Sequence, residues 1–219
     1  MIRTALLVCA KDLRIEMRSR VLLWQVLPFG AMALLLCGIS LGPQRAGTST
    51  SGPGLFYLVT LLVTLLMINR SQGVEKTPGT RSSIATLGLD PAGVFLGKTL
   101  ALSVELWVTG LILLGGSVVV LHTSLHGALL ALPSVLVTLC TLAAAGTLYG
   151  ALTSGGEGAA TLLPVLALPA FAPLLIAGER SFSAALNHGG IWQWWLILSV
   201  ALAVYTGIGI LLYGVLEES

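Results

Sequence analysis

Residues 194–216 read WWLILSVALAVYTGIGILLYGVL, a run without a single charged side chain. About 20 apolar residues are enough for a helix to cross the hydrocarbon core of a bilayer. The rest of the 219-residue chain is similar, since 56% of its residues are hydrophobic, only 9% are charged and the mean hydropathy is +0.96. A soluble domain carries about 25% charged residues. The composition therefore excludes a soluble enzyme, a nucleic-acid-binding domain and a disordered chain, and it predicts an all-α polytopic membrane protein.

Polar breaks divide the apolar sequence into six predicted transmembrane helices. The predicted spans are residues 21–41, 54–69, a segment within 91–121, 127–152, 159–178 and 194–216. Residues 70–90 form the one sizeable polar loop on the side of the termini. Residues 179–193 are expected to form a loop or a re-entrant segment on the other side. We expect residues 1–219 to make a single transmembrane domain.

The basic residues predict how the chain is oriented. Six spans place both termini on one side of the membrane, and nine of the eleven Lys and Arg residues fall on that side, before the first span or between Arg70 and Lys98. Cytoplasmic flanks of membrane helices carry an excess of Lys and Arg. We therefore expect a multi-pass protein of the cell (inner) membrane with both termini in the cytoplasm.

Residues 1–20 carry a helical pattern of their own. Apolar residues recur there at three- and four-residue steps, at Leu6, Cys9, Leu13 and Met17, whereas Lys11, Arg14 and Arg18 fall on another face. This pattern favours an amphipathic helix lying along the membrane interface. The alternative is a basic flank that only sets the orientation.

No motif of an enzyme occurs in the sequence, neither HExxH nor GxSxG nor the phosphate-binding GxxxxGK[ST]. We therefore assign no catalytic, cofactor-binding or metal-binding residue, and a process driven by ATP would need its ATPase on another chain. His122 and His126 are four residues apart and could present two imidazoles to a metal or haem iron, or could simply end a span.

Two ionisable residues fall within the third predicted span. Lys98 and Glu105 are seven residues apart, which places them on one helical face about 10 Å apart along the axis. Lys98 lies near the inner end and can snorkel to the surface, whereas Glu105 lies deeper and needs a partner. Glu105 could line a polar path or bind a partner subunit, or it could be neutral and hydrogen-bonded between helices.

The fifth predicted span contains Pro164, Pro169 and Pro173. Proline removes a backbone hydrogen bond and kinks a helix. We therefore expect kinks at these positions, either in a moving element or in a static helix shaped for packing.

The loop at 70–90 is where a cytoplasmic partner would bind. Thr80 could cap a short helix over residues 81–87, which would suit a groove on that partner. The residues expected to couple the chain to the partner are Gln72, Glu75, Gly79, Arg81, Ile84 and Leu87. The alternative is a solvated loop that only supplies charge.

Three stretches together resemble one protein family. They are the basic segment KDLRIEMR at 11–18 with the first span that ends in LGP at 41–43, the loop from Gly79 through Leu87 to the Gly97-Lys98 pair, and LP at 168–169 followed by PLLI at 173–176. In these features and in its six spans the chain resembles the haem exporter protein B (CcmB) family, the permease subunit of an ABC transporter of cytochrome c maturation. It departs from the family at Ser82 and Ser83, where members usually carry acidic residues.

The resemblance implies a permease of the ABC-exporter type that works with a separate cytoplasmic ATPase. Residues 79–87 would be the coupling helix seated in that CcmA-like subunit, which would bind the ATP. Other expected partners are CcmC-like and CcmD-like membrane subunits, membrane lipid and a second copy of this chain, with haem as the cargo. The alternatives are an exporter permease for a drug, lipid or glycan, and a membrane scaffold that transports nothing.

Overall fold

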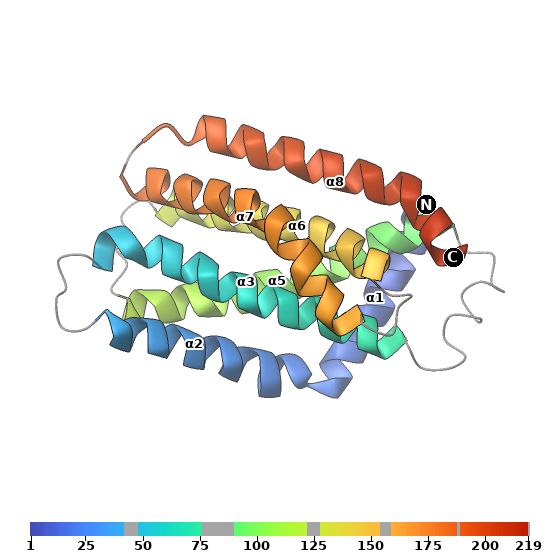
Figure 1. Cartoon of the computed structure of the whole chain (residues 1–219), viewed down its shortest axis with the longest axis horizontal. Coiled ribbons are helices and arrows are strands. Elements are labelled where there is room, and N and C mark those ends of the chain that lie inside the picture. The colour runs from blue at the N-terminus through green and yellow to red at the C-terminus, as the bar shows by residue number, and fades with distance from the viewer. Residues whose placement is uncertain (42–47, 76–89, 122–127, 154–158, 188, 219) are drawn as a thin grey trace.

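The chain folds as a bundle of long helices with one shorter helix across an end (Figure 1). The computed structural model describes residues 1–41, 48–75, 90–121, 128–153, 159–187 and 189–218. In these ranges all regular structure is helical. The elements are α1 (Ile2–Ser19), the π-helical turn η1 (Leu22–Val26), α2 (Leu27–Ser40), α3 (Thr48–Glu75), α5 (Pro91–Val120), α6 (Ala128–Thr153), α7 (Ala159–Leu186) and α8 (Trp192–Glu218).

Within the described ranges six helices are long and apolar enough to cross a membrane, which confirms the predicted number. These spans are Leu22–Ser40, Ser51–Ser71, Pro91–Val120, Leu130–Thr153, Leu162–Leu186 and Trp192–Tyr213. Both termini lie at the same end of the bundle, as an even number of crossings requires (Figure 1). Helix α1 also lies at this end and runs across the direction of the long helices.

Two helices extend further than the sequence predicted. Helix α3 continues through residues 70–75, which were expected to begin a loop. Helix α7 continues to Leu186, so the prediction of a loop or re-entrant segment over 179–193 is wrong for residues 179–186. The cause is packing, because Phe182 and Ala185 are buried against the other helices although polar residues surround them in the sequence.

Helix α6 lies at the centre of the bundle. It packs against α3, α5, α7 and α8, and 67% of its span is buried, compared with 22% for the span of α2 and 11% for that of α8. Small residues allow this close packing. At Gly146, for example, an added Cβ would lie 2.5 Å from Cδ1 of Ile68 on α3.

The hydroxyl groups inside the bundle are satisfied largely within their own helices. Thr60, Thr64 and Thr138 each donate to the carbonyl oxygen four residues earlier, at 2.7–2.8 Å. An unsatisfied polar group in hydrocarbon costs several kcal/mol, so this back-bonding lets the chain keep Thr and Ser in its core.

Candidate functional site

The predicted coupling loop lies between two helix ends that the structure describes. Gly79, Arg81, Ile84 and Leu87 fall in 76–89, outside the described residues, whereas Gln72 and Glu75 lie on the last turns of α3. On the other side of the loop, α5 begins at Pro91 with Asp90 as its N-cap residue. The candidate site is therefore built from these two flanks and from what packs on them.

Helix α1 ends in a sharp corner before the first span. Its C-cap residue Arg20 has φ 51°, a left-handed conformation that is unfavourable for a side chain other than Gly or Asn. Across this corner the backbone N–H of Leu22 donates to Oε1 of Glu16 at 2.7 Å. The carboxylate thus satisfies a backbone donor at the start of η1 and holds the corner in place.

The same carboxylate joins α1 to the end of α3. Arg70 Nη1 lies 2.6 Å from Oε2 of Glu16 and donates to Oε1 at 2.8 Å, while Nη2 donates to Oγ of Ser19 at 2.9 Å. The Glu16 and Arg70 side chains are 13% and 23% exposed, so solvent screens this pair only partly. Arg70 is therefore the link between the corner and the flank of the loop on α3.

On the other flank, α1 packs against the first turns of α5. A Cβ added at Gly93 would lie 2.8 Å from the carbonyl oxygen of Met1, and one added at Gly97 would lie 2.6 Å from that of Ala5 and 2.7 Å from Cβ of Val8. Only glycine allows this approach. The G-x-x-x-G spacing of 93–97 places both glycines on one face, which is the usual arrangement for close helix contact in membranes.

Helix α1 therefore contacts both flanks of the segment 76–89. Its C-terminal end is held on α3 through Glu16 and Arg70, and its N-terminal half is held on α5 at Gly93 and Gly97. The amino group of Met1 also lies 3.1 Å from Oδ2 of Asp90. We call this arrangement the α1 clasp.

From its place near the inner end of the span, Lys98 could have snorkelled to the surface, but in the structure it does not. Its side chain is buried and Nζ donates to Oη of Tyr213 on α8 at 2.5 Å, with Nζ 5.3 Å from the centre of the ring. Phe95 lies beside this pair, 5.6 Å from the Tyr213 ring. An added Cβ at Gly209 would collide with the Phe95 ring, so α8 approaches α5 closely here. Lys98 thus connects the start of α5 to the end of α8.

Glu105 is half-buried on α5, the helix on which α1 packs. Burial raises the pKa of the Cys9 thiol on α1, and the negative charges of Asp12 and Glu105 raise this pKa further. The carboxyl group of Glu105 is also within Coulombic reach of Glu16 and Arg70. The structure therefore directs Lys98 and Glu105 to different neighbours, although they share one helix.

The remaining predicted residues do not join this site. Pro164, Pro169 and Pro173 lie inside α7, which stays helical through all three, and their role as kinks remains a prediction. His122 and His126 fall outside the described residues. No group of three His, Cys, Asp or Glu side chains that could hold a metal occurs in the part of the chain that the structure describes.

Two parts of the clasp are not predicted by the sequence analysis above. The glycine pair has a signal in the G-x-x-x-G spacing at 93–97, of which the sequence analysis names only Gly97. The pair of Glu16 and Arg70 had none, because 54 residues separate them and nothing in the sequence marks them as neighbours.

Comparison with known proteins gives one consistent result. The family model "CcmB protein" matches residues 3–211. Heme exporter protein B of Rhodobacter capsulatus is 30% identical over 208 residues, covering 91% of this chain and 88% of its own length. The protein of the same name from Pseudomonas aeruginosa is 29% identical over 190 residues, covering 83% and 81%. That of Paracoccus denitrificans is 30% identical over 180 residues, covering 78% of each chain. The match over nearly the whole length shows that this chain belongs to the CcmB family.

Proposed function

We propose that this chain is the membrane permease subunit of an ABC transporter complex for haem export in cytochrome c maturation. Its relatives are named heme exporter protein B, and the six membrane-spanning helices suit such a subunit. ATP hydrolysis takes place on a separate CcmA-like subunit. The single observation that carries the structural part of this proposal is the α1 clasp, which contacts both flanks of the segment where that ATPase docks.

The clasp suggests how motion of the ATPase reaches the membrane. When the ATPase moves residues 76–89, the force acts on the end of α3 and on the start of α5. Because α1 is joined to α3 through Arg70 and packed on α5 at Gly93 and Gly97, the three helices move together. Motion of α1 passes through the corner at Arg20 into the first span, and motion of α5 passes through Lys98 and Tyr213 into α8.

Other features of the proposal follow from the family and the charge pattern. Both termini and the docking segment face the cytoplasm, as the excess of basic residues there indicates. CcmC-like and CcmD-like subunits complete the assembly, with haem as cargo. The small buried fractions of the α2 and α8 spans leave room for these subunits or for a second copy of the chain.

Co-purification with a CcmA-like ATPase tests the docking role. We expect Leu87→Asp to reduce the recovered ATPase at least tenfold, because a charge would face an apolar groove on the partner. Asn187→Asp is the control, since it adds the same charge at an exposed position on the opposite end of the bundle. Equal recovery with both variants would refute the docking assignment.

The cargo needs a separate measurement. In cells that lack their own copy of this subunit, expression of the chain should restore covalent haem attachment to c-type cytochromes, and Leu87→Asp should not. Normal ATPase binding without restored haem attachment would favour an exporter of another cargo.

A further inference from the structure

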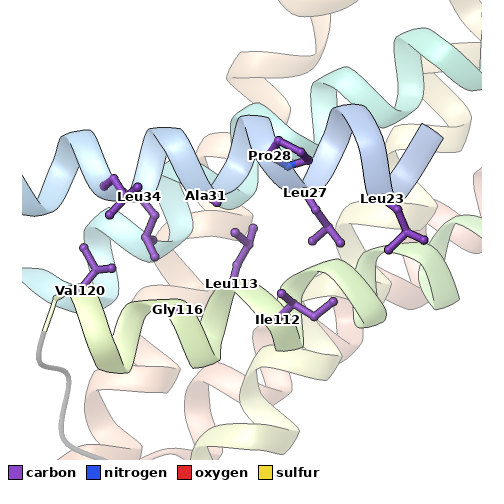
Figure 2. A pocket seen from close by; sticks show the side chains of 10 residues that line it. Leu23, Leu27, Pro28, Ala31, Leu34, Ile112, Leu113, Gly116 and Val120 are labelled. Atoms are coloured by element: carbon purple, nitrogen blue, oxygen red, sulfur yellow. The ribbon is translucent and has the colours of Figure 1, made fainter. Parts of the chain in front are cut away.

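An apolar groove of about 410 Å³ lies between α2 and α5 on the outside of the bundle (Figure 2). All of its lining residues are apolar, and several are exposed at the surface, including Leu23 at 56% and Ile112 at 50%. The surface around it belongs to two membrane-spanning helices. The groove therefore opens toward lipid and not toward water.

Small residues create the groove. Ala31 on α2 and Gly116 on α5 lie opposite each other along it, between the larger side chains of Leu27, Leu34 and Leu113 (Figure 2). A Cβ added at Gly116 would already lie 3.1 Å from Cδ2 of Leu34. The two helices are thus close together below the groove, while the space above the small residues is left for a ligand.

The groove runs along much of the first span. It extends over η1 and α2 from Leu23 to Leu35, and twelve residue steps of about 1.5 Å each cover roughly 18 Å. On α5 it reaches Val120, the last residue of that helix at the end opposite the termini. Since Leu23 follows directly on the corner of α1, the groove starts at the membrane surface on the side of the termini and continues past the midplane of the bilayer.

The charge at this end of the groove is positive. Arg18 and Arg20 are exposed on the corner, three to five residues before Leu23. Trp24 is 75% exposed beside them, as is usual for tryptophan at the level of lipid headgroups. Arg70, by contrast, is engaged by Glu16 and faces the clasp. The corner thus carries two exposed arginines at the end of the groove that begins with Leu23.

An extended acyl chain is thin enough to lie in the groove between α2 and α5 along its whole length.

We propose that this groove is a binding site for an anionic phospholipid, with one acyl chain between α2 and α5 and the phosphate of the headgroup against Arg18 and Arg20. The lipid would fill the space between the first span and α5, next to the corner that joins α1 to the membrane. The site depends on the geometry of α2 and α5 and not on the cargo or the ATPase, so it can be tested independently of the proposed function.

Native mass spectrometry of the purified full chain tests the site with two probes, phosphatidylglycerol and phosphatidylcholine with the same acyl chains. We expect one phosphatidylglycerol to be retained with at least tenfold higher affinity than phosphatidylcholine. Ala31→Trp fills the groove and should lower the retention of phosphatidylglycerol at least tenfold. Ala203→Trp is the control, because it places the same side chain at an exposed position of α8. Ala31→Leu is a milder variant of the same test and should give an intermediate loss.

The headgroup contact is tested with Arg18→Gln and Arg20→Gln together. A basic residue near the membrane surface contributes about fivefold in affinity for anionic lipid, so the double variant should lose roughly 30-fold in phosphatidylglycerol binding and nothing in phosphatidylcholine binding. Arg3→Gln with Arg180→Gln removes the same charge elsewhere and should change neither by more than about twofold.

Three results would overturn the proposal. Equal retention by Ala31→Trp, Ala31→Leu and Ala203→Trp would mean that the lipid is not in the groove. A preference for phosphatidylglycerol that survives in the Arg18 and Arg20 double variant would remove the headgroup assignment. Loss of a dimer in Ala31→Trp with lipid retention unchanged would show that a second copy of the chain occupies the groove.

Discussion

Glu16 is the residue on which the clasp depends most directly. One carboxylate accepts the backbone N–H of Leu22 and pairs with Arg70, and therefore joins a helix corner to a second helix. Removing one partner of a largely buried ion pair is costly because the other charge stays behind without compensation. The carboxylate also offsets the unfavourable left-handed conformation of Arg20, which costs roughly 1–3 kcal/mol.

We expect Glu16→Gln to lower the free energy of unfolding by about 1–3 kcal/mol, because the amide keeps an acceptor for Leu22 but removes the charge that pairs with Arg70. The midpoint of unfolding in SDS measures this. Asp12→Asn is the matched control on the same helix, since Asp12 pairs with the half-exposed Lys11 and should contribute less than about 1 kcal/mol. Equal effects of the two variants would mean that the Arg70 pair adds no stability.

Glu105 is the other acidic residue to test, since its half-buried carboxyl lies near the clasp. We expect Glu105→Gln to insert at normal levels but to lower haem attachment to c-type cytochromes at least tenfold, because an amide of nearly the same shape cannot ionise. Glu179→Gln on α7, where Ser183 donates to the carboxylate at 2.8 Å, controls for loss of an acid elsewhere in a span. Full complementation by Glu105→Gln would assign Glu105 to helix packing.

At the scale of helices, the apolar pattern of the sequence predicted the six membrane spans, because hydropathy alone decides where a span lies. All six spans follow from runs such as 194–216, because a helix needs about 20 predominantly apolar residues to cross the hydrocarbon core. The end of α7 was not predictable in this way. Contact with other helices buries Ser181, Phe182 and Ala185. Because the charged residues Glu179 and Arg180 precede them, the sequence there resembles a polar loop. The position of α1 on Gly93 and Gly97 is likewise decided by tertiary contact.

The glycine contact can be tested with one added methyl group. We expect Gly97→Ala to push α1 away from α5, because the new Cβ would lie 2.6 Å from a backbone oxygen that cannot move without the whole helix. Backbone amides of residues 2–19 should then exchange with deuterium at least tenfold faster, and overpacking of this kind costs about 1–3 kcal/mol. In the proposed complex the ATPase should still bind, but its activity should respond less to the permease.

Gly115→Ala on the same helix is the control for this variant. Nothing lies within 4 Å of a Cβ added at Gly115, so the substitution only improves helix propensity and should leave exchange in α1 unchanged. If Gly97→Ala exchanges like Gly115→Ala, α1 is not held on α5 by the glycine contact.

In the whole molecule, the few basic residues are concentrated at one end of the bundle. Most of the Lys and Arg residues lie in α1, at the end of α3, in the segment 76–89 or at the start of α5. The structure brings α1 and the two flanks together at the end that holds both termini (Figure 1). A chain with so little charge thus keeps it at the end where we propose that a soluble partner docks and that an anionic lipid headgroup binds.

This arrangement predicts which end of the bundle faces the cytoplasm. In a variant with Cys9, Cys37 and Cys140 replaced by serine, Asn187→Cys should react in intact spheroplasts with a thiol reagent that cannot cross the inner membrane, because Asn187 is exposed at the end opposite the termini. Ser71→Cys, exposed at the end of α3, should react only after the membrane is permeabilised. The reverse pattern would place the clasp outside the cell membrane, where no ATP is available, and would exclude docking of an ATPase at this end.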